Sequence, residues 1–189
     1  PGPTDAIIRV AATSLCGTDA HIYNWDSWAH SRIHPPRIIG HEMCGEVVEV
    51  GSDVTLVKVG DYVAAESHIT CGHCFQCRTG QAHVCKNYRI LGVDRDGSFA
   101  DYIVLPETVL WKTSPAIPSE LACLQEPLGN AVDAALVEDL TGQTVLITGC
   151  GPTGLFATAV ARTAGAAIII ATDASAYRLD LAKQLGADH

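Results

Sequence analysis

Short stretches in which apolar and polar residues alternate fill the first two thirds of the chain, and this pattern predicts a domain built from β-strands. The stretches are rich in Val, Ile and Ala, and Gly, Pro or Asp residues separate them, as expected where turns connect strands. The expected strands span residues 6–13, 38–50, 62–66 and 100–105.

The pattern changes near residue 121, where longer apolar stretches with helical spacing begin to alternate with short buried strands. Such alternation is typical of βαβ units around a parallel sheet. We therefore expect a β-rich domain at residues 1–120 and an α/β domain at residues 121–189. The expected helices of the second domain span residues 129–140, 152–164 and 176–185, and its expected strands span residues 144–148 and 167–172.

Composition and charge limit the classes of function. The chain of 189 residues has a formal net charge of −9 and no basic cluster that could neutralise nucleic-acid phosphates, so nucleic acid is not an expected partner. No apolar run reaches membrane-spanning length, so a membrane is not expected either. Eight cysteines without a secretory leader favour a reducing compartment, and we expect a cytoplasmic protein. Both ends of the chain lack closing elements, and we interpret it as a fragment.

Four closely spaced cysteines form the most specific motif. Their spacing, C-x2-C-x2-C-x7-C, lets four thiolates converge on one Zn²⁺ in a closed shell that stabilises the fold without catalysing a reaction. The surrounding stretch, about residues 70–86, has few apolar residues, so a metal is expected to hold it in shape. Disulfides and an Fe–S cluster are the alternatives, and the spacing suits both less well. The cysteines are Cys71, Cys74, Cys77 and Cys85.

A second motif, G-x-G-x-x-G, joins an expected strand to an expected helix. In this context it is typical of a turn that binds the pyrophosphate of a dinucleotide, and a plain Gly-rich turn is the alternative. Asp173 ends the next strand and can accept hydrogen bonds from both ribose hydroxyls, which favours NAD over NADP. Arg178 could instead meet a 2′-phosphate, stack on the adenine or lie in solvent. The turn residues expected to bind the cofactor are Gly149, Gly151, Pro152, Thr153 and Gly154.

A further group of possible metal ligands is spread along the chain. Cys16 follows one expected strand, His41 and Glu42 lie at the start of another, and Glu126 opens the first helix of the α/β domain. Three protein ligands with one exchangeable position are the arrangement of a catalytic zinc. Spacing alone supports this site weakly, because a single Cys or His is more often a core residue than a ligand.

Several motifs together resemble the zinc-containing medium-chain alcohol dehydrogenases. The segment GHEMCGEVVEVGSDV fits that family's pattern G-H-E-x2-G-x5-G-x2-V, and CGTD, the four-cysteine stretch, GSFADYIVLP and GCGPTG occur in the family's order. The resemblance covers essentially the whole chain. It implies a GroES-like catalytic domain followed by a truncated Rossmann domain that binds NAD, and it implies a homotetramer.

The resemblance also implies roles for individual residues. Cys16, His41 and Glu126 would bind a catalytic zinc, with Glu42 beside them and able to enter the metal shell. The four cysteines would bind a structural zinc, so that each subunit would hold two Zn²⁺ ions.

The segments HIYNWDSWA, ESHITCGHC, LGVDRDGSFADY and EPLGNAV resemble the branch of this family that oxidises L-threonine. This implies that zinc lowers the pKa of the substrate hydroxyl, that NAD⁺ takes the hydride, and that 2-amino-3-oxobutanoate is the product. A dehydrogenase of the same family acting on a polyol such as sorbitol or butanediol is one alternative. A non-catalytic, zinc-stabilised nucleotide-binding module is an alternative of a different class.

The proton released from the alcohol needs a route out of the site. Thr18 follows Cys16 closely and is expected to pass the proton on, and His21 is expected to end the route because an imidazole exchanges protons near neutral pH. A helix-capping role for Thr18 and a surface position for His21 are the alternatives. By resemblance His68 lies near the active-site entrance, where it would influence substrate fit or proton transfer, or make a structural hydrogen bond.

Overall fold

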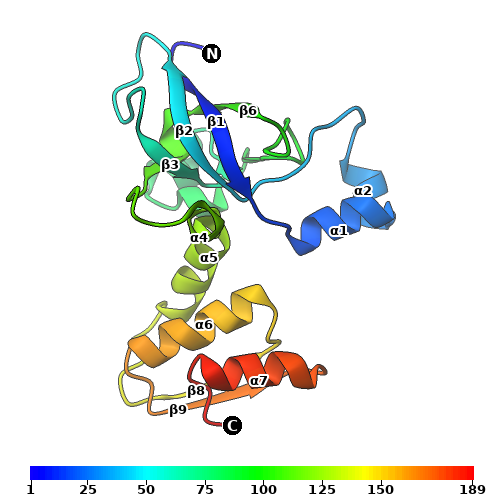
Figure 1. Ribbon diagram of the computed structural model, residues 1–189, viewed down its shortest axis with the longest axis vertical. Coiled ribbons are helices and arrows are strands. Elements are labelled where there is room, and N and C mark those ends of the chain that lie inside the picture. The colour runs from blue at the N-terminus through cyan, green and yellow to red at the C-terminus, as the bar shows by residue number, and fades with distance from the viewer. The chain divides into compact units, whose positions relative to one another are not determined.

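A five-stranded antiparallel sheet forms the centre of the first of two units into which the chain divides, Pro1–Glu126 and Pro127–His189. The computed structural model describes all 189 residues. The strands lie in the order β6-β1-β2-β3-β7 (Figure 1). They span Asp5–Thr13 (β1), Met43–Val50 (β2), Tyr62–Ala65 (β3), Tyr102–Pro106 (β6) and Leu110–Lys112 (β7).

Aliphatic side chains from four of these strands form the main core of the first unit. Ile8, Val47, Val63 and Leu105 are each completely buried in one cluster. Complete burial of such a side chain stabilises a fold by about 1.5–3 kcal/mol. The alternation of apolar and polar positions predicted these strands because one face of the sheet is buried and the other is more exposed.

The second strand begins five residues later than expected, at Met43 and not at residue 38. Gly40 has a backbone φ of +92°, and a Cβ atom there would lie 2.2 Å from the ring of Phe99. The backbone of residues 38–40 bonds instead to residues 97–99, with the amide nitrogen of Ser98 donating to the carbonyl of Gly40 at 2.9 Å. The prediction that residues 38–42 are strand is therefore wrong, and His41 and Glu42 lie in a loop.

Short helices and a two-stranded sheet complete the first unit. Cys16 is the N-cap residue of helix α1, and Asp26 caps helix α2 by accepting the amide of Ala29 at 2.9 Å. No helix of the chain combines the length and apolar character needed to cross a membrane. The additional elements are α1 (Gly17–Asn24), α2 (Ser27–Arg32), β4 (His68–Ile69), α3 (Phe75–Arg78), η1 (Ala82–Val84), β5 (Arg89–Ile90), η2 (Glu107–Val109) and α4 (Ser119–Ala122).

Strands and helices alternate in the second unit, and its two strands are parallel. Ile169 and Ala171 of the second strand pack in clusters with Ala161 and Ala182, so the two helices that supply these alanines lie on the same face of the sheet (Figure 1). The elements are β8 (Thr144–Thr148), α6 (Pro152–Thr163), β9 (Ile168–Thr172) and α7 (Ala176–Gln184).

The helix α5 (Gln125–Ala135) differs most from its expected bounds, because it begins four residues before residue 129 and ends five before residue 140. Pro127 lies in its first turn, where the missing amide hydrogen would have no helical partner anyway. A β-rich unit followed by a parallel α/β unit confirms the predicted fold class.

Candidate metal and dinucleotide sites

Four cysteine sulfurs converge around α3, and all four are free of disulfides. The Sγ–Sγ distances are 3.5 Å for Cys74–Cys77, 3.7 Å for Cys74–Cys85 and 3.6 Å for Cys71–Cys85. Four sulfurs placed tetrahedrally about 2.3 Å from one Zn²⁺ would be about 3.8 Å apart, whereas a disulfide bond is about 2.05 Å long. The sulfur positions therefore fit a single metal ion and do not fit disulfides.

Nitrogen donors surround these sulfurs. The backbone amides of Cys71 and Asn87 both donate to Sγ of Cys85 at 3.4 Å, and Nδ2 of Asn87 donates to Sγ of Cys71 at 3.7 Å. Hydrogen bonds, the strongest from the backbone at His73, lower the pKa of Cys71 to about 6, while burial and neighbouring sulfurs raise the pKa of Cys77 to about 11. Donors of this kind stabilise thiolates, which are the form that binds zinc.

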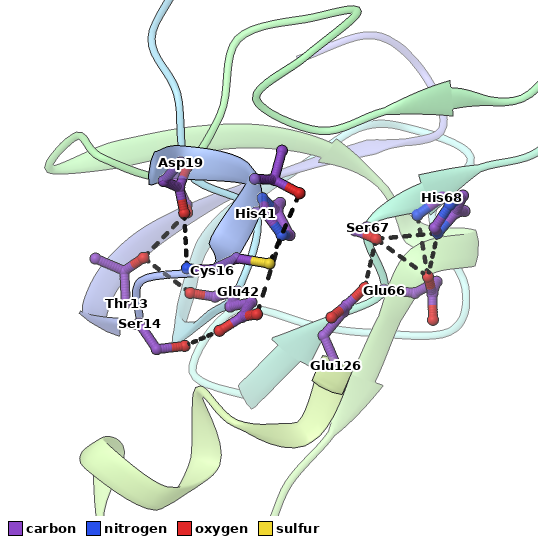
Figure 2. Close-up of polar contacts among 12 residues, drawn as sticks. Thr13, Ser14, Cys16, Asp19, His41, Glu42, Glu66, Ser67, His68 and Glu126 are labelled. Atoms are coloured by element: carbon purple, nitrogen blue, oxygen red, sulfur yellow. Dashed lines mark hydrogen bonds and ion pairs between the residues drawn. The ribbon is translucent and has the colours of Figure 1, made fainter. Parts of the chain in front are cut away.

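A second group of possible ligands lies where β1 ends and β2 begins. Cys16 is the N-cap residue of α1, and His41 and Glu42 precede β2. One ligand atom from each of the three residues lies within 4.8 Å of the others, and Nε2 of His41 is 4.0 Å from Oε1 of Glu42. His41 is 6% exposed and Glu42 is 5% exposed. Figure 2 shows the three side chains close together.

The electrostatics of this group stabilise a negative thiolate on Cys16 beside a positive partner. The hydrogen bond with His41 is the main cause that lowers the pKa of Cys16. Burial opposes protonation of His41, but the hydrogen bond with Cys16 and the charges of Asp19 and Glu126 raise its pKa on balance. A thiolate, an imidazole and a carboxylate are ligands that zinc accepts, and three of them leave a fourth position for a substrate.

Polar groups near the end of β1 hold these residues in place. The hydroxyl of Ser14 donates to Oε2 of Glu42, and the hydroxyl of Thr13 donates to the carbonyl of Glu42 at 2.8 Å. Oδ2 of Asp19 accepts the amide of Cys16 at 2.9 Å, while Oδ1 of Asp19 is buried without a partner. The contacts of Thr13 and Ser14 could not be predicted from the sequence because they depend on the pairing of β1 with β2, whereas the contact of Asp19 with Cys16 is local to the start of α1.

Glu126 belongs to a third polar group, together with Glu66 and His68, and not to the group around Cys16. The hydroxyl of Ser67, which is 1% exposed, donates to Oε1 of Glu126 at 2.6 Å. The structure thus brings three of the four predicted ligands together and holds Glu126, which is 8% exposed, beside a different set of side chains (Figure 2).

His68 is half-buried within this third group. Its Nδ1 lies 3.0 Å from Oγ of Ser67 and 3.1 Å from Oε1 of Glu66. The hydrogen bond with Glu66 is the main cause that raises the pKa of His68. Burial would raise the pKa of Glu66, but its hydrogen bonds with His68 lower it on balance. Glu66 and Ser67 were not predicted, although polar residues directly after the buried strand β3 were a signal.

The two residues of the expected proton route lie on α1. The thiol of Cys16 donates to Oγ1 of Thr18 at 3.7 Å, which places Thr18 beside the candidate metal ligands. Cys16 caps the helix, so the alternative capping role of Thr18 is wrong. The side chain of His21 is 63% exposed, and its Nδ1 lies 2.5 Å from Oδ2 of Asp26. The proton route through these two residues remains a prediction.

The glycine motif forms a tight turn between β8 and α6. Gly149 has a φ of +90°, and a Cβ at Gly154 would lie 1.9 Å from the carbonyl oxygen of Gly149, so neither position accepts a larger residue without strain. Gly151 is the N-cap of α6, Pro152 is its first residue, and Thr153 follows in the first turn. The unbonded amides of such a helix start suit a pyrophosphate.

Asp173 lies just after β9, close to this turn. Its Oδ2 accepts the amide of Cys150 at 2.8 Å, and its Oδ1 accepts the amide of Ser175 at 2.8 Å. These backbone donors lower the pKa of Asp173. Nη1 of Arg178 is 3.8 Å from Oδ2 of Asp173, so the two residues considered for ribose recognition lie side by side.

Comparison with known proteins identifies the family to which this chain belongs. Residues 2–116 match the alcohol dehydrogenase GroES-like domain. L-threonine 3-dehydrogenase from Pyrococcus horikoshii is 56% identical over 189 residues, which are 100% of this chain and 54% of that protein. The chain spans about half the length of the curated relatives it matches.

Two solved structures match the chain over its whole length. A dehydrogenase from Sinorhizobium meliloti 1021, described as zinc-binding and bound to NADP, has a TM-score of 0.89 at 35% identity and is covered to 54%. A short chain alcohol dehydrogenase from Escherichia coli CFT073, complexed with NADH, has a TM-score of 0.90 at 34% identity and is covered to 55%. The chain therefore belongs to the alcohol dehydrogenase family with a GroES-like domain. The resemblance inferred from the sequence motifs is confirmed.

Proposed function

We propose that the protein containing this chain is a zinc-dependent dehydrogenase that oxidises the secondary hydroxyl of L-threonine to 2-amino-3-oxobutanoate with NAD⁺. The convergence of the partly exposed Cys16 with the buried His41 and Glu42 carries this proposal, because mixed Cys, His and carboxylate ligands with a free fourth position are typical of catalytic zinc. Identities of 50–56% with relatives named L-threonine 3-dehydrogenase support the substrate.

The chain has residues for two zinc ions. Cys16, His41 and Glu126 would hold the catalytic ion, with Glu42 able to enter its shell, and the four clustered cysteines would hold the structural ion. When bound, the catalytic zinc supplies the positive charge that makes a substrate hydroxyl easier to deprotonate. The burial of His41 and Glu42 keeps water from these ligands, and the hydrogen bonds from Ser14 and Thr13 fix the position of Glu42.

Residues of α1 would carry the proton away. Thr18 lies within hydrogen-bonding range of Cys16, and this supports the expectation that its Oγ1 accepts the proton of the alcohol. His21 is exposed and paired with Asp26, which makes it a suitable group to release the proton to water.

The turn at residues 149–154 would bind the pyrophosphate of the cofactor, and Asp173 would bind its ribose. We propose NAD as the cofactor because the carboxylate of Asp173 would repel a 2′-phosphate. Two structural neighbours were solved with different nicotinamide cofactors, NADP and NADH, so the preference needs a direct test. Titration of the protein with NAD⁺ and with NADP⁺ should show tighter binding of NAD⁺, and the reverse order would contradict this assignment.

A substrate comparison tests the reaction itself. The intact protein is assayed for NAD⁺ reduction with L-threonine, sorbitol and butanediol at equal concentrations, before and after zinc is removed by a chelator. We expect the highest kcat/KM with L-threonine and loss of the activity on chelation. Higher kcat/KM with a polyol would assign the protein to the polyol dehydrogenases, and no reduction with any alcohol would support a non-catalytic module.

A further inference from the structure

The carboxylate of Asp26 joins the expected end of the proton route to the second short helix. Its Oδ2 lies 2.5 Å from Nδ1 of His21, and its Oδ1 accepts the amide of Ala29 at 2.9 Å. Asp26 is the N-cap residue of α2, so one of its oxygens is fixed by the backbone of that helix. The other oxygen is thereby held in place against the imidazole of His21.

The turn between α1 and α2 brings this carboxylate to the imidazole. Trp25 ends α1 in the left-handed conformation, with a φ of +49°, and it is the only residue other than glycine with a positive φ. A bulky residue adopts this conformation at an energetic cost, and residues strained in this way cluster at functional sites. The turn places Asp26 in contact with His21, and the ring of Trp28 meets the imidazole edge-on at a centroid distance of 6.2 Å.

The contact with Asp26 determines which nitrogen of His21 carries the hydrogen. Hydrogen bonds, first from the amide of Ala29 and then from His21, lower the pKa of Asp26, so its carboxylate is ionised at neutral pH and can only accept. Nδ1 of His21 therefore donates, which leaves Nε2 of the neutral imidazole as its acceptor. Because 63% of the His21 side chain is exposed, Nε2 can also pass a proton on to water.

We propose that Asp26 is a positioning residue for proton release, which keeps a hydrogen on Nδ1 of His21 and so presents Nε2 as the atom that takes the proton of the alcohol after Thr18. This inference rests on the proposed function, because it assigns the proton route to Thr18 and His21. These two residues lie three positions apart on α1, a spacing that sets side chains on the same face of a helix. One proton enters at Nε2 and leaves from Nε2 to water, and the charge of Asp26 compensates the positive charge that the ring carries in between.

The tautomer of His21 tests this proposal without reference to activity. Nuclear magnetic resonance spectra of the intact protein with ¹⁵N-labelled histidine are recorded at alkaline pH, where histidines are neutral, and the His21 signals are identified by their loss in His21→Gln. We expect the Nδ1–H tautomer in the parent protein. In Asp26→Ser the shorter side chain still caps α2 but does not reach the imidazole, so we expect the Nε2–H tautomer that free histidine side chains favour.

Steady-state kinetics of the same variants show whether the tautomer matters for the reaction. A positioned base contributes about 10²–10⁴-fold to a proton transfer, so Asp26→Ser should lower kcat with L-threonine at least about tenfold. The KM values should change less than about twofold, because Asp26 acts through His21 and not on the substrate. Added imidazole buffer should restore part of the lost kcat, since it can take the proton in place of His21. In a His21→Gln background, Asp26→Ser should have no further effect.

Asp139→Ser is the matched control, because Asp139 is also an exposed carboxylate that accepts a backbone amide, that of Thr141 at 2.9 Å, and it makes no hydrogen bond with a histidine. This variant should keep the parent tautomer and kcat. An Nε2–H tautomer in the parent protein, an unchanged kcat in Asp26→Ser, or a loss of kcat that persists in the His21→Gln background would overturn the positioning role of Asp26 and leave the proposed function intact. A parent protein with the Nδ1–H tautomer that does not oxidise L-threonine would overturn the proposed function, and with it the role of Asp26 in the reaction.

Discussion

Replacing Cys85 with serine is expected to weaken the structural zinc site far more than it weakens the rest of the fold. Cys85 is 1% exposed, its sulfur lies 3.6 Å and 3.7 Å from the sulfurs of Cys71 and Cys74, and two backbone amides donate to it. Cys85→Ser therefore removes a sulfur that the structure places at the distance expected for a tetrahedral zinc shell.

The magnitude follows from the number of ligands. Structural zinc sites contribute about 10–16 kcal/mol of binding free energy, so each of four equivalent sulfurs contributes about 2.5–4 kcal/mol. Loss of one sulfur should weaken zinc binding by a factor between about 50 and about 1,000. The main aliphatic core, with Ile8 and Val63, does not include the cysteine stretch and should stay folded.

Competition with a chromogenic chelator measures this change, and limited proteolysis shows whether residues 70–86 become accessible. Cys44→Ala is the matched control, because Cys44 is a completely buried free thiol outside the sulfur group and should leave the zinc content unchanged. If Cys85→Ser bound zinc as tightly as the parent protein, or if mass spectrometry showed disulfides among the four cysteines, the metal assignment would be wrong.

Three further predictions concern the cofactor turn and the stability of each unit. Gly154→Ala would place a Cβ 1.9 Å from the carbonyl oxygen of Gly149. The substitution should weaken NAD⁺ binding at least about tenfold in equilibrium dialysis. Unchanged binding would contradict the role of this turn in binding the cofactor. Glu107 is 9% exposed and accepts two backbone amides at 2.7 Å and 2.6 Å. Glu107→Ala should therefore lower the free energy of unfolding by about 2–4 kcal/mol in urea denaturation. A loss below about 0.5 kcal/mol would show that these two hydrogen bonds contribute little. The amide of Ile169 and the guanidinium of Arg162 lower the pKa of Asp188, so this carboxylate stabilises the folded state at neutral pH. This stabilisation should be lost as the pH falls from about 4 through the lower pKa of the folded state. The free energy of unfolding of Asp188→Asn should fall less over this pH range than that of the parent protein, and an equal fall would show that Asp188 does not contribute.

Local sequence patterns predicted the strands and helices whose apolar positions face the core. The strand expected at residues 144–148 has these bounds in the structure, since its alternate residues pack against α6. The start of β2 could not be predicted, because Gly40 turns the chain toward residues 97–99 and that pairing joins segments far apart in sequence. The short helices α1 and α2 carry too few residues to show a helical period.

The two candidate metal sites also differ in how well the sequence alone predicts them. Short loops bring the four cysteines together, so their spacing alone predicted one sulfur group. Cys16 and His41 meet only because β1 pairs with β2 in a register that sets Thr13 opposite Met43, which spacing does not reveal. The hydroxyl of Ser67 donates to Glu126, and no motif in the sequence indicated that contact.

Zinc content before and after one substitution tests the central claim most directly. The claim is that Cys16 binds the zinc of the reaction while the four cysteines bind another. The intact protein should contain two zinc ions per chain by mass spectrometry of the metal, and Cys16→Ser should contain one and lose NAD⁺ reduction with L-threonine. Two zinc ions and full activity in Cys16→Ser, or a single zinc ion in the active parent protein, would contradict the account.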